Sequence, residues 1–147
     1  MKVIIQRCKE GKVSVSNKIV NQIKNGFVIL VGISKNDTIE DIDYLVNKIL
    51  KLRVFDDEKG VMNKSIIDIN GEILSISQFT LQAITKDGNR PSYINAMNGA
   101  EALKLYELFN SKLNEDIKTY PGVFGADMIL DIKNHGPVTI IIDSKNK

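Results

Sequence analysis

Apolar and polar residues alternate in the first part of the chain, over residues 3–8 and again over 13–16. This alternation predicts strands with one buried face. Residues 27–33 are almost continuously apolar and rich in β-branched side chains, as in a strand buried on both faces. Gly11 and the Asn25-Gly26 pair are typical of turns. The N-terminal part therefore predicts edge-type strands, then a central strand, with turns at Gly11 and Asn25-Gly26.

Two later segments change to helical spacing. Asp37, followed three residues later by Glu40, predicts a capping box at the start of a helix. A second helix is predicted to begin near Asn98, again with a glutamate, Glu101, at the third position. The apolar stripes that would face a sheet are Ile42, Leu45, Val46, Ile49 and Leu52 in the first helix, and Ala102, Leu105, Phe109 and Leu113 in the second.

Further strands are predicted at residues 54–55, 73–81, 128–132 and 138–142, with turns at 56–60 and at Asn70-Gly71. The order is strands, helix, strands, helix, strands. This order predicts an α+β fold, with a mixed, mostly antiparallel or barrel-like sheet and two main helices. Neither a linker nor a repeat interrupts residues 1–147, which we interpret as a single domain.

Composition narrows the class of protein only a little. A lone cysteine, Cys8, cannot form an internal disulfide, and no stretch of apolar residues is long enough to span a bilayer, so we expect a cytoplasmic protein. The net charge is +2, which is too small for binding long nucleic acid through phosphate neutralisation. Any contact with RNA is therefore expected to be local.

Common catalytic signatures are missing from the sequence, among them G-x-S-x-G, the phosphate-binding GxxxxGK[ST] loop and H-E-x-x-H. One histidine and one cysteine cannot build a His/Cys metal site, and no metal or cofactor is expected. Cys8 is interpreted as a small core residue, and residues 56–58 as a solvated turn. His135 could be a general base, but without an orienting acid we favour a loop residue.

Residues 75–81 carry three hydroxyls and an amide, which is unusual for a buried strand because buried polar groups need partners. In a regular strand Gln78 and Thr80 would face away from Ser77. Ser77 and Thr80 can line one pocket only if the strand bends or ends there. From the residues alone, a pocket and purely structural hydroxyls both remain open.

Two motifs then carry a resemblance over essentially the full chain. Ser77-Gln78-Phe79-Thr80-Leu81 resembles the SQFTL motif of the D-aminoacyl-tRNA deacylases, also called D-tyrosyl-tRNA deacylases, and residues 134–139 resemble their second motif, which contains a Gly-cisPro pair. Residues 62–63, 88–92 and 124–128 support the match. The sequence departs from the family at His135, where an acidic residue is more usual.

The resemblance implies hydrolysis of the ester of D-aminoacyl-tRNA, and also of glycyl-tRNA, in chiral proofreading during translation. It implies a homodimer in which the Gly136-Pro137 pair of one subunit enters the pocket of the other, which binds the 3' CCA end of the tRNA. The catalytic residues would be Ser77, Phe79 and Thr80; Gln78, Met128, Gly136 and Pro137 would bind substrate; and Arg7, Lys86, Arg90 and Lys133 are candidate RNA contacts.

The expected chemistry needs no catalytic triad. An aminoacyl ester is already activated, so a positioned water and stabilisation of the oxyanion suffice. A threonine hydroxyl is a weak nucleophile without a base, so we expect the N–H groups of Phe79 and Thr80 to bind the carbonyl. The alternatives are a module that binds RNA ends without cutting them, a structural dimer with a vestigial site, and a hydrolase of unrelated esters.

Overall fold

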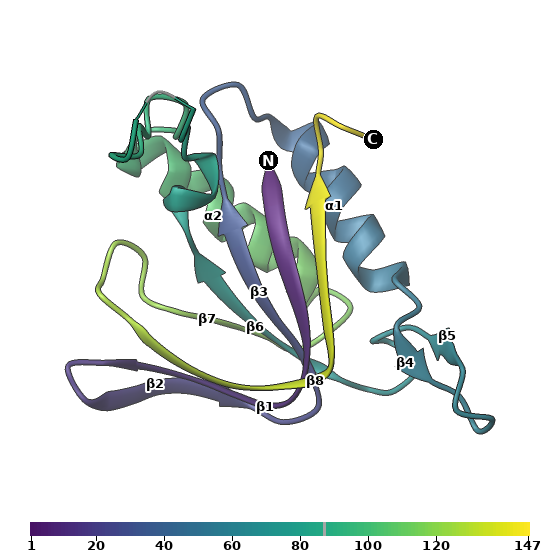
Figure 1. Ribbon diagram of the computed structural model, residues 1–147. Coiled ribbons are helices and arrows are strands. Elements are labelled where there is room, and N and C mark those ends of the chain that lie inside the picture. The colour runs from purple at the N-terminus through teal and green to yellow at the C-terminus, as the bar shows by residue number, and fades with distance from the viewer. Residues whose placement is uncertain (87) are drawn as a thin grey trace.

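The computed structural model describes residues 1–86 and 88–147, and its sheet carries both long helices on one side (Figure 1). The elements in chain order are β1 (Lys2–Val15), β2 (Lys18–Ile23), β3 (Gly26–Gly32), α1 (Ile39–Lys51), β4 (Phe55–Asp56), β5 (Met62–Lys64), β6 (Glu72–Ser77), the 3-10 helix η1 (Phe79–Gln82), α2 (Gly99–Asn114), β7 (Thr119–Pro121) and β8 (Ile129–Asp143). Within the described residues, no helix is long and apolar enough to cross a membrane.

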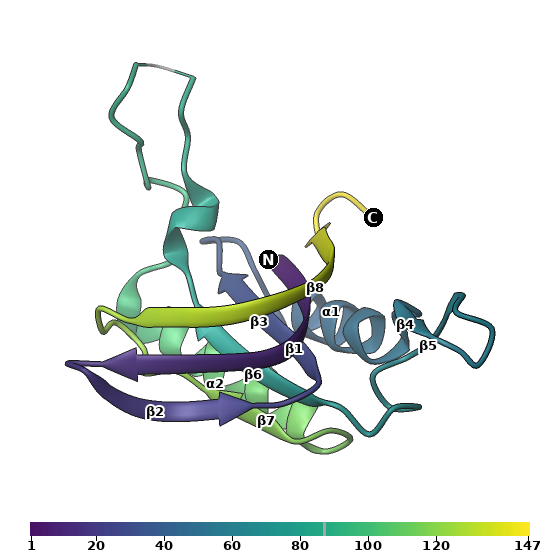
Figure 2. The same cartoon turned by 60° about the horizontal axis from the view of Figure 1, so that its bottom comes forward.

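The sheet is mixed, as the order of elements predicted. Its strands run β2-β1-β3-β6-β7, with β8 also paired to β1. β1 is antiparallel to β2, β3 and β8, whereas β6 is parallel to β3 and β7. The Asn21 side chain on β2 donates to the Pro121 carbonyl of β7 over 2.7 Å. The sheet therefore curls into a nearly closed, barrel-like shape (Figure 2).

Two apolar clusters lie on the two faces of the sheet. The larger packs the sheet against both helices, and its fully buried members include Val3, Ile5, Phe27, Ile29, Ile42, Leu45, Ile49, Ile73, Phe109 and Leu113. The smaller lies inside the curl and contains Cys8, Val13, Ile23, Val28, Leu74 and Ile76. Cys8 is fully buried, as expected of a core residue, and burial raises the pKa of its thiol to about 11.

The predicted turn at Gly11 is wrong, because β1 continues through this residue. A Cβ at Gly11 would lie 2.6 Å from Cγ2 of Val28, so the glycine permits close approach of strands rather than a reversal. The chain instead turns at Ser16 and Asn17, both at positive φ. The prediction missed the following strand, β2, for lack of clear alternation.

The first helix begins one residue later than predicted. Thr38, not Asp37, is its N-cap, and the Thr38 N–H donates to the carboxylate of Asp41 over 2.8 Å. Asp37 is buried and binds the amino group of Met1, so it is not available for capping. The second helix begins as predicted, with the Asn98 side chain accepting from the Glu101 N–H over 3.1 Å.

The two predicted C-terminal strands form one strand, β8. Its ladder with β1 passes from the pair Gln6–Thr139 to the pair Cys8–Asn134, so residues 135–138 bulge out of register. Because proline removes a ladder hydrogen bond, the Gly136-Pro137 pair predicted a break between two strands. Nothing in the sequence indicated that the segments before and after this pair would both bind β1.

Candidate functional site

The hydroxyl-rich segment lies where a strand ends, not along a strand as predicted. β6 stops at Ser77, and the Gln78 N–H donates to the Val31 carbonyl over 2.7 Å. The chain then winds into η1, because the Leu81 N–H binds the Gln78 carbonyl (3.2 Å). The alternation of side chains is lost at this point, so consecutive residues can face one hollow.

That hollow is a cavity of about 450 Å³ between the end of β6, the start of α2 and the loop before β8. Of the predicted site residues, Ser77, Gln78, Phe79 and Met128 line it, whereas Thr80, Gly136 and Pro137 do not. The sequence did not reveal the other lining residues, which are Val31, Ile33, Ile76, Ala96, Met97, Gly99, Ala102, Phe124, Gly125, Ala126, Asp127 and Leu130. Most of these residues are apolar or small, so their side chains do not indicate a site. Only residues 124–128 stood out in the sequence, because they support the resemblance to the family.

Among the described residues, no base contacts the Thr80 hydroxyl. Its Oγ1 accepts a hydrogen bond from the Gln78 side-chain amide over 2.6 Å, and an amide cannot take up a proton from it. Among the described lining residues, Asp127 is the one with a carboxylate, and Asp127 is exposed to solvent. The geometry gives no support to Thr80 as an activated nucleophile.

Two backbone donors lie at the same place. The first N–H groups of a helix have no partner within it, and in η1 these belong to Phe79 and Thr80. In the described part of the chain, neither N–H makes a hydrogen bond outside the helix. A pair of adjacent free N–H donors beside a cavity can stabilise an oxyanion.

The cavity wall rests on Tyr106 of α2. The Tyr106 hydroxyl donates to the Ser75 carbonyl over 2.7 Å, and its ring lies 5.7 Å from the ring of Phe124. Burial raises the pKa of Tyr106, so the hydroxyl stays protonated and remains a donor. The Ser75 side chain is fully buried beneath this wall and does not reach the cavity. Within the segment, Ser75 is therefore a core residue whose hydroxyl has no partner among the described residues, and Ser77 lines the pocket.

The Gly136-Pro137 peptide is cis and lies on the surface, in the bulge of β8. The Asn134 side-chain amide donates to the Arg7 carbonyl (2.9 Å) and to the Val138 carbonyl (3.0 Å), which ties the two ends of the bulge together. The pair is thus exposed but firmly anchored, outside the cavity of its own chain.

Arg7 anchors the same bulge from below, which corrects the expectation that it is a surface cation. Only 5% of Arg7 is exposed. Its guanidinium donates to the His135 carbonyl (3.1 Å) and the Val54 carbonyl (2.6 Å), and it pairs with Asp56 (3.2 Å). Partial burial and the nearby positive charge of Arg7 lower the pKa of His135, so its ring is neutral at neutral pH. His135 lies outside the cavity, but in the bulge of β8 and not in a loop as expected.

The remaining predicted cations are exposed. Lys86 and Arg90 follow η1 but do not line the cavity, whereas Lys133 on β8 forms an ion pair with Glu10 over 2.5 Å. The described residues contain no group of three or more His, Cys, Asp or Glu side chains that could hold a metal ion.

Two solved structures share the fold. One, a c-Myc DNA Unwinding Element Binding Protein, is 39% identical, with a TM-score of 0.93 and coverage of 97% of this chain and 98% of the other. The second, described as a probable eukaryotic D-amino acid tRNA deacylase, is 18% identical with a TM-score of 0.82, and the match covers 96% and 97% of the chains. At that identity the likeness shows the fold alone.

Sequence relatives are closer. The D-aminoacyl-tRNA deacylase of Clostridium novyi (strain NT) is 54% identical over all of this chain and 99% of its own length. That of Flavobacterium psychrophilum is also 54% identical, with the same coverage. The family described as D-Tyr-tRNA(Tyr) deacylase matches residues 4–143. Its two motifs in this chain are the strand end at the cavity and the anchored bulge of β8, and the chain belongs to the D-Tyr-tRNA(Tyr) deacylase family.

Proposed function

We propose that this protein hydrolyses the ester of D-aminoacyl-tRNA, releasing a free D-amino acid and tRNA, and so removes wrong-handed residues before translation uses them. Relatives at 54% identity bear the name D-aminoacyl-tRNA deacylase. The observation that carries the proposal for this chain is that the segment Ser77–Phe79 forms a wall of the cavity. The site and the family motif therefore coincide.

The chemistry follows from what the cavity offers. The Phe79 and Thr80 N–H groups bind the ester carbonyl and stabilise the negative charge that develops on its oxygen. Ser77 and Gln78 shape the pocket, and Gln78 also holds the Thr80 hydroxyl. Since no side-chain base of the described residues contacts Thr80, a water molecule attacks the ester, with the neighbouring 2'-OH of the RNA assisting its activation.

The proposal includes a homodimer, because the second of the two motifs, which contains Gly136-Pro137, lies away from the cavity of its own chain. Gly136 and Pro137 are exposed and held by Arg7 and Asn134, as a part that enters another subunit must be. β8 pairs only with β1 in the described sheet, and its side chains Ile129 and Ile141 are 60% and 65% exposed. An open edge with apolar side chains suits contact with a second copy.

Chirality is then decided by exclusion. A firmly held Gly136-Pro137 pair from the partner leaves room beside the substrate Cα for hydrogen but not for a side chain. An L residue is rejected, whereas a D residue points its side chain out of the pocket. Glycine has no Cβ and passes the same filter, so glycyl-tRNA is also cut.

The first experiment compares hydrolysis of D-tyrosyl-tRNA and L-tyrosyl-tRNA by the purified protein, with EDTA in a parallel set. We expect rapid loss of the D ester alone, unchanged by EDTA, and slower cleavage of glycyl-tRNA at higher enzyme concentration. Stability of both tyrosyl esters, with the dimer intact, would favour a module that binds RNA ends without cutting them.

A mixed dimer tests whether the site is shared. One chain carries Ala126→Leu, which fills the cavity, and the other carries Gly136→Ala, which alters the bulge. Each homodimer should be nearly inactive. In the mixed dimer the unaltered cavity meets the unaltered bulge once, so about half the activity of one normal dimer should return. No recovery in a confirmed mixed dimer would rule out sharing.

A further inference from the structure

A segment between η1 and α2 projects away from the sheet, and both of its ends lie at the cavity. We define the projecting segment as residues 83–86 and 88–95. Ile84 and Ser92 exchange two backbone hydrogen bonds of 2.8 and 2.9 Å, so its base is a paired hairpin. Phe79, before the segment, and Ala96, after it, both line the cavity. In Figure 2 it extends well beyond the body of the protein.

Two aromatic rings form a ledge where the projecting segment meets the cavity. The rings of Phe79 and Tyr93 lie edge to face with their centroids 5.0 Å apart. Phe79 is 56% exposed and Tyr93 is 38% exposed, although large aromatic side chains are usually buried. The ledge therefore offers an aromatic surface that continues outward from the cavity.

Three cations lie on the projecting segment or at its base. Lys86 and Arg90 are exposed on the projecting segment, and the exposed Lys35 lies at its base, where the Lys35 N–H donates to the Asn95 carbonyl over 3.0 Å. None of the three forms an ion pair within the described residues, whereas Lys64, Lys112 and Lys133 all do. The sequence of the segment adds one acidic residue, Asp87.

We propose that the Phe79–Tyr93 ledge and the projecting segment bind the single-stranded 3' end of RNA, next to the terminal nucleoside held in the cavity. This inference rests on the proposed function and specifies how its substrate is held. A base can stack on an exposed aromatic ring whatever its identity, and the cations along the projecting segment and at its base can contact the phosphates of the following nucleotides. A self-association surface fits less well, because lysines such as Lys35 and Lys86 are depleted from protein interfaces.

The test compares a full substrate with a minimal one. Tyr93→Ala should raise the KM for D-tyrosyl-tRNA about tenfold, as expected for one lost stacking contact. The same variant should change the KM for 3'-O-D-tyrosyl-adenosine, which lacks the upstream nucleotides, by less than about twofold, because no stacking contact is lost there. Tyr93→Phe should restore the KM for the tRNA, because it retains the ring.

Ile94→Ala is the matched control. Ile94 is the neighbouring residue, is 64% exposed and is apolar without being aromatic. If Ile94→Ala raises the KM as much as Tyr93→Ala, the surface is a general apolar contact and the stacking ledge is wrong. The ledge is also wrong if Tyr93→Ala converts the dimer to monomers, or if it affects the minimal substrate equally.

The cations are tested through salt. Changing Lys35, Lys86 and Arg90 together to Gln should weaken binding of an RNA minihelix that carries no amino acid and ends in a single-stranded CCA. It should also reduce the slope of log Kd against log salt concentration by about two, if three phosphate contacts are lost. An unchanged slope would overturn the cationic part of the proposal.

The binding assay separates the inference from the proposed function. If the wild-type protein cuts no ester but Tyr93→Ala still weakens minihelix binding, the ledge is correct and the proposed reaction is wrong. If the wild-type protein cuts the D ester but Tyr93→Ala binds and cuts as the wild type does, the proposed function stands and the ledge is wrong.

Discussion

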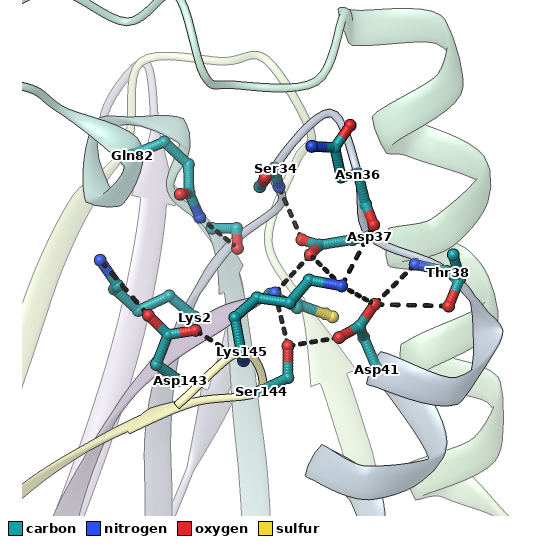
Figure 3. A network of polar contacts seen from close by, with 12 residues as sticks. Lys2, Ser34, Asn36, Asp37, Thr38, Asp41, Gln82, Asp143, Ser144 and Lys145 are labelled. Carbon is teal, nitrogen blue, oxygen red and sulfur yellow. Dashed lines mark hydrogen bonds and ion pairs between the residues drawn. The ribbon is translucent and has the colours of Figure 1, made fainter. Parts of the chain in front are cut away.

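Two polar regions of this protein differ in how completely their hydrogen bonds are satisfied. One joins the start of α1 to residues near both ends of the chain (Figure 3). The other is the cavity at the end of β6. In the first, nearly every charged or polar group has a protein partner. In the second, backbone donors lie free beside an open hollow.

The network at the start of α1 is saturated. The Met1 amino group binds Asp37 (2.5 Å) and Ser144 (2.6 Å), and the Ser144 hydroxyl donates to Asp41 (2.6 Å). Lys145 donates to the same carboxylate of Asp41 over 2.7 Å. Buried charges are tolerated only when paired in this way. These bonds tie the start of α1 to residues near both ends of the chain.

The cavity shows the opposite arrangement. The Phe79 and Thr80 N–H groups have no partner among the described residues, and most of the cavity lining is apolar or small. Unsatisfied donors cost stability unless a ligand or water meets them. The comparison teaches that in this fold unsatisfied backbone donors, more than charge, distinguish a binding site from a structural network.

The largest effect should come from filling the cavity. Ala126→Leu adds bulk to the lining, so we expect kcat/KM for D-tyrosyl-tRNA to fall about 100-fold, since displacement of the substrate by about an ångström can cost that much. The melting temperature should change little. Ala100→Leu, at an exposed position near the start of α2, is the control and should be active. Full activity of Ala126→Leu would place the substrate elsewhere.

The second-largest loss of activity is expected at Gly136, which lies outside the cavity lining. Gly136 has a φ of +117°, and a Cβ there would lie 2.9 Å from the Val138 nitrogen. Gly136→Ala should lower kcat/KM about 30-fold and cost about 2 kcal/mol of stability, both from strain and from the displaced bulge. Gly60→Ala has similar strain, at φ +75°, but no neighbouring atom within 4 Å, and should stay active. Equal losses in both variants would contradict a role for the bulge.

The saturated network should respond in stability and not in activity. Burial alone would raise the pKa of Asp41, but hydrogen bonds from Lys145, Ser144 and the Thr38 N–H outweigh it and hold the pKa well below its ordinary value. Asp41→Asn should therefore reduce the free energy of unfolding by about 2 kcal/mol at pH 7. Urea unfolding measures this loss, and kcat/KM should be unchanged.

The same pKa shift fixes the pH dependence. Because the folded-state pKa of Asp41 is lowered, its stabilisation is complete above the ordinary value of 3.8 and is lost as the pH falls below it. Stability of the wild type should decline through this range more steeply than that of Asp41→Asn. Asp43→Asn, which removes an exposed ion pair between α1 and Lys112 of α2, should cost under about 1 kcal/mol. Parallel pH curves for wild type and Asp41→Asn would show that Asp41 is not responsible.

The smallest loss of activity is expected at Thr80, although its hydroxyl is the first group to consider as a nucleophile. Thr80→Ala removes a hydroxyl whose bond is to the Gln78 amide, so kcat should fall no more than about threefold, in line with one neutral hydrogen bond. Single-turnover hydrolysis measures this, with Thr80→Ser as control. Loss of all activity, together with an acyl-enzyme in the wild type, would make Thr80 the nucleophile after all.

Local patterns predicted the elements well where one physical rule dominated. The apolar run at 27–33 became β3, and the capping residues at Asn98 started α2. They failed where a contact distant in sequence competed. Asp37 could not cap α1 because Met1 occupies its carboxylate, and Gly11 did not turn because Val28 packs over it. Neither contact is visible in a window of neighbouring residues.

The candidate site divides in the same way. Ser77, Gln78, Phe79 and Met128 were identified as site residues from the sequence and do line the cavity, whereas Arg7 was expected at the surface and is buried. The residues next to Arg7 in the sequence do not show that its guanidinium will contact two carbonyl oxygens and one carboxylate from distant parts of the chain. Only the folding of β4 and the bulge of β8 against β1 creates that environment for Arg7.

By itself the sequence determined the α+β class, the two helices and the two motifs, because these depend on periodicity and on residue types that are adjacent in the chain. The tertiary structure decided where β6 ends, and with it which side chains share a cavity. It also decided that Gly136 and Pro137 lie on the surface, away from that cavity. The physical reason is that side-chain direction follows the backbone, which leaves the sheet for η1 directly after its last bond to β3, from the Gln78 N–H to the Val31 carbonyl.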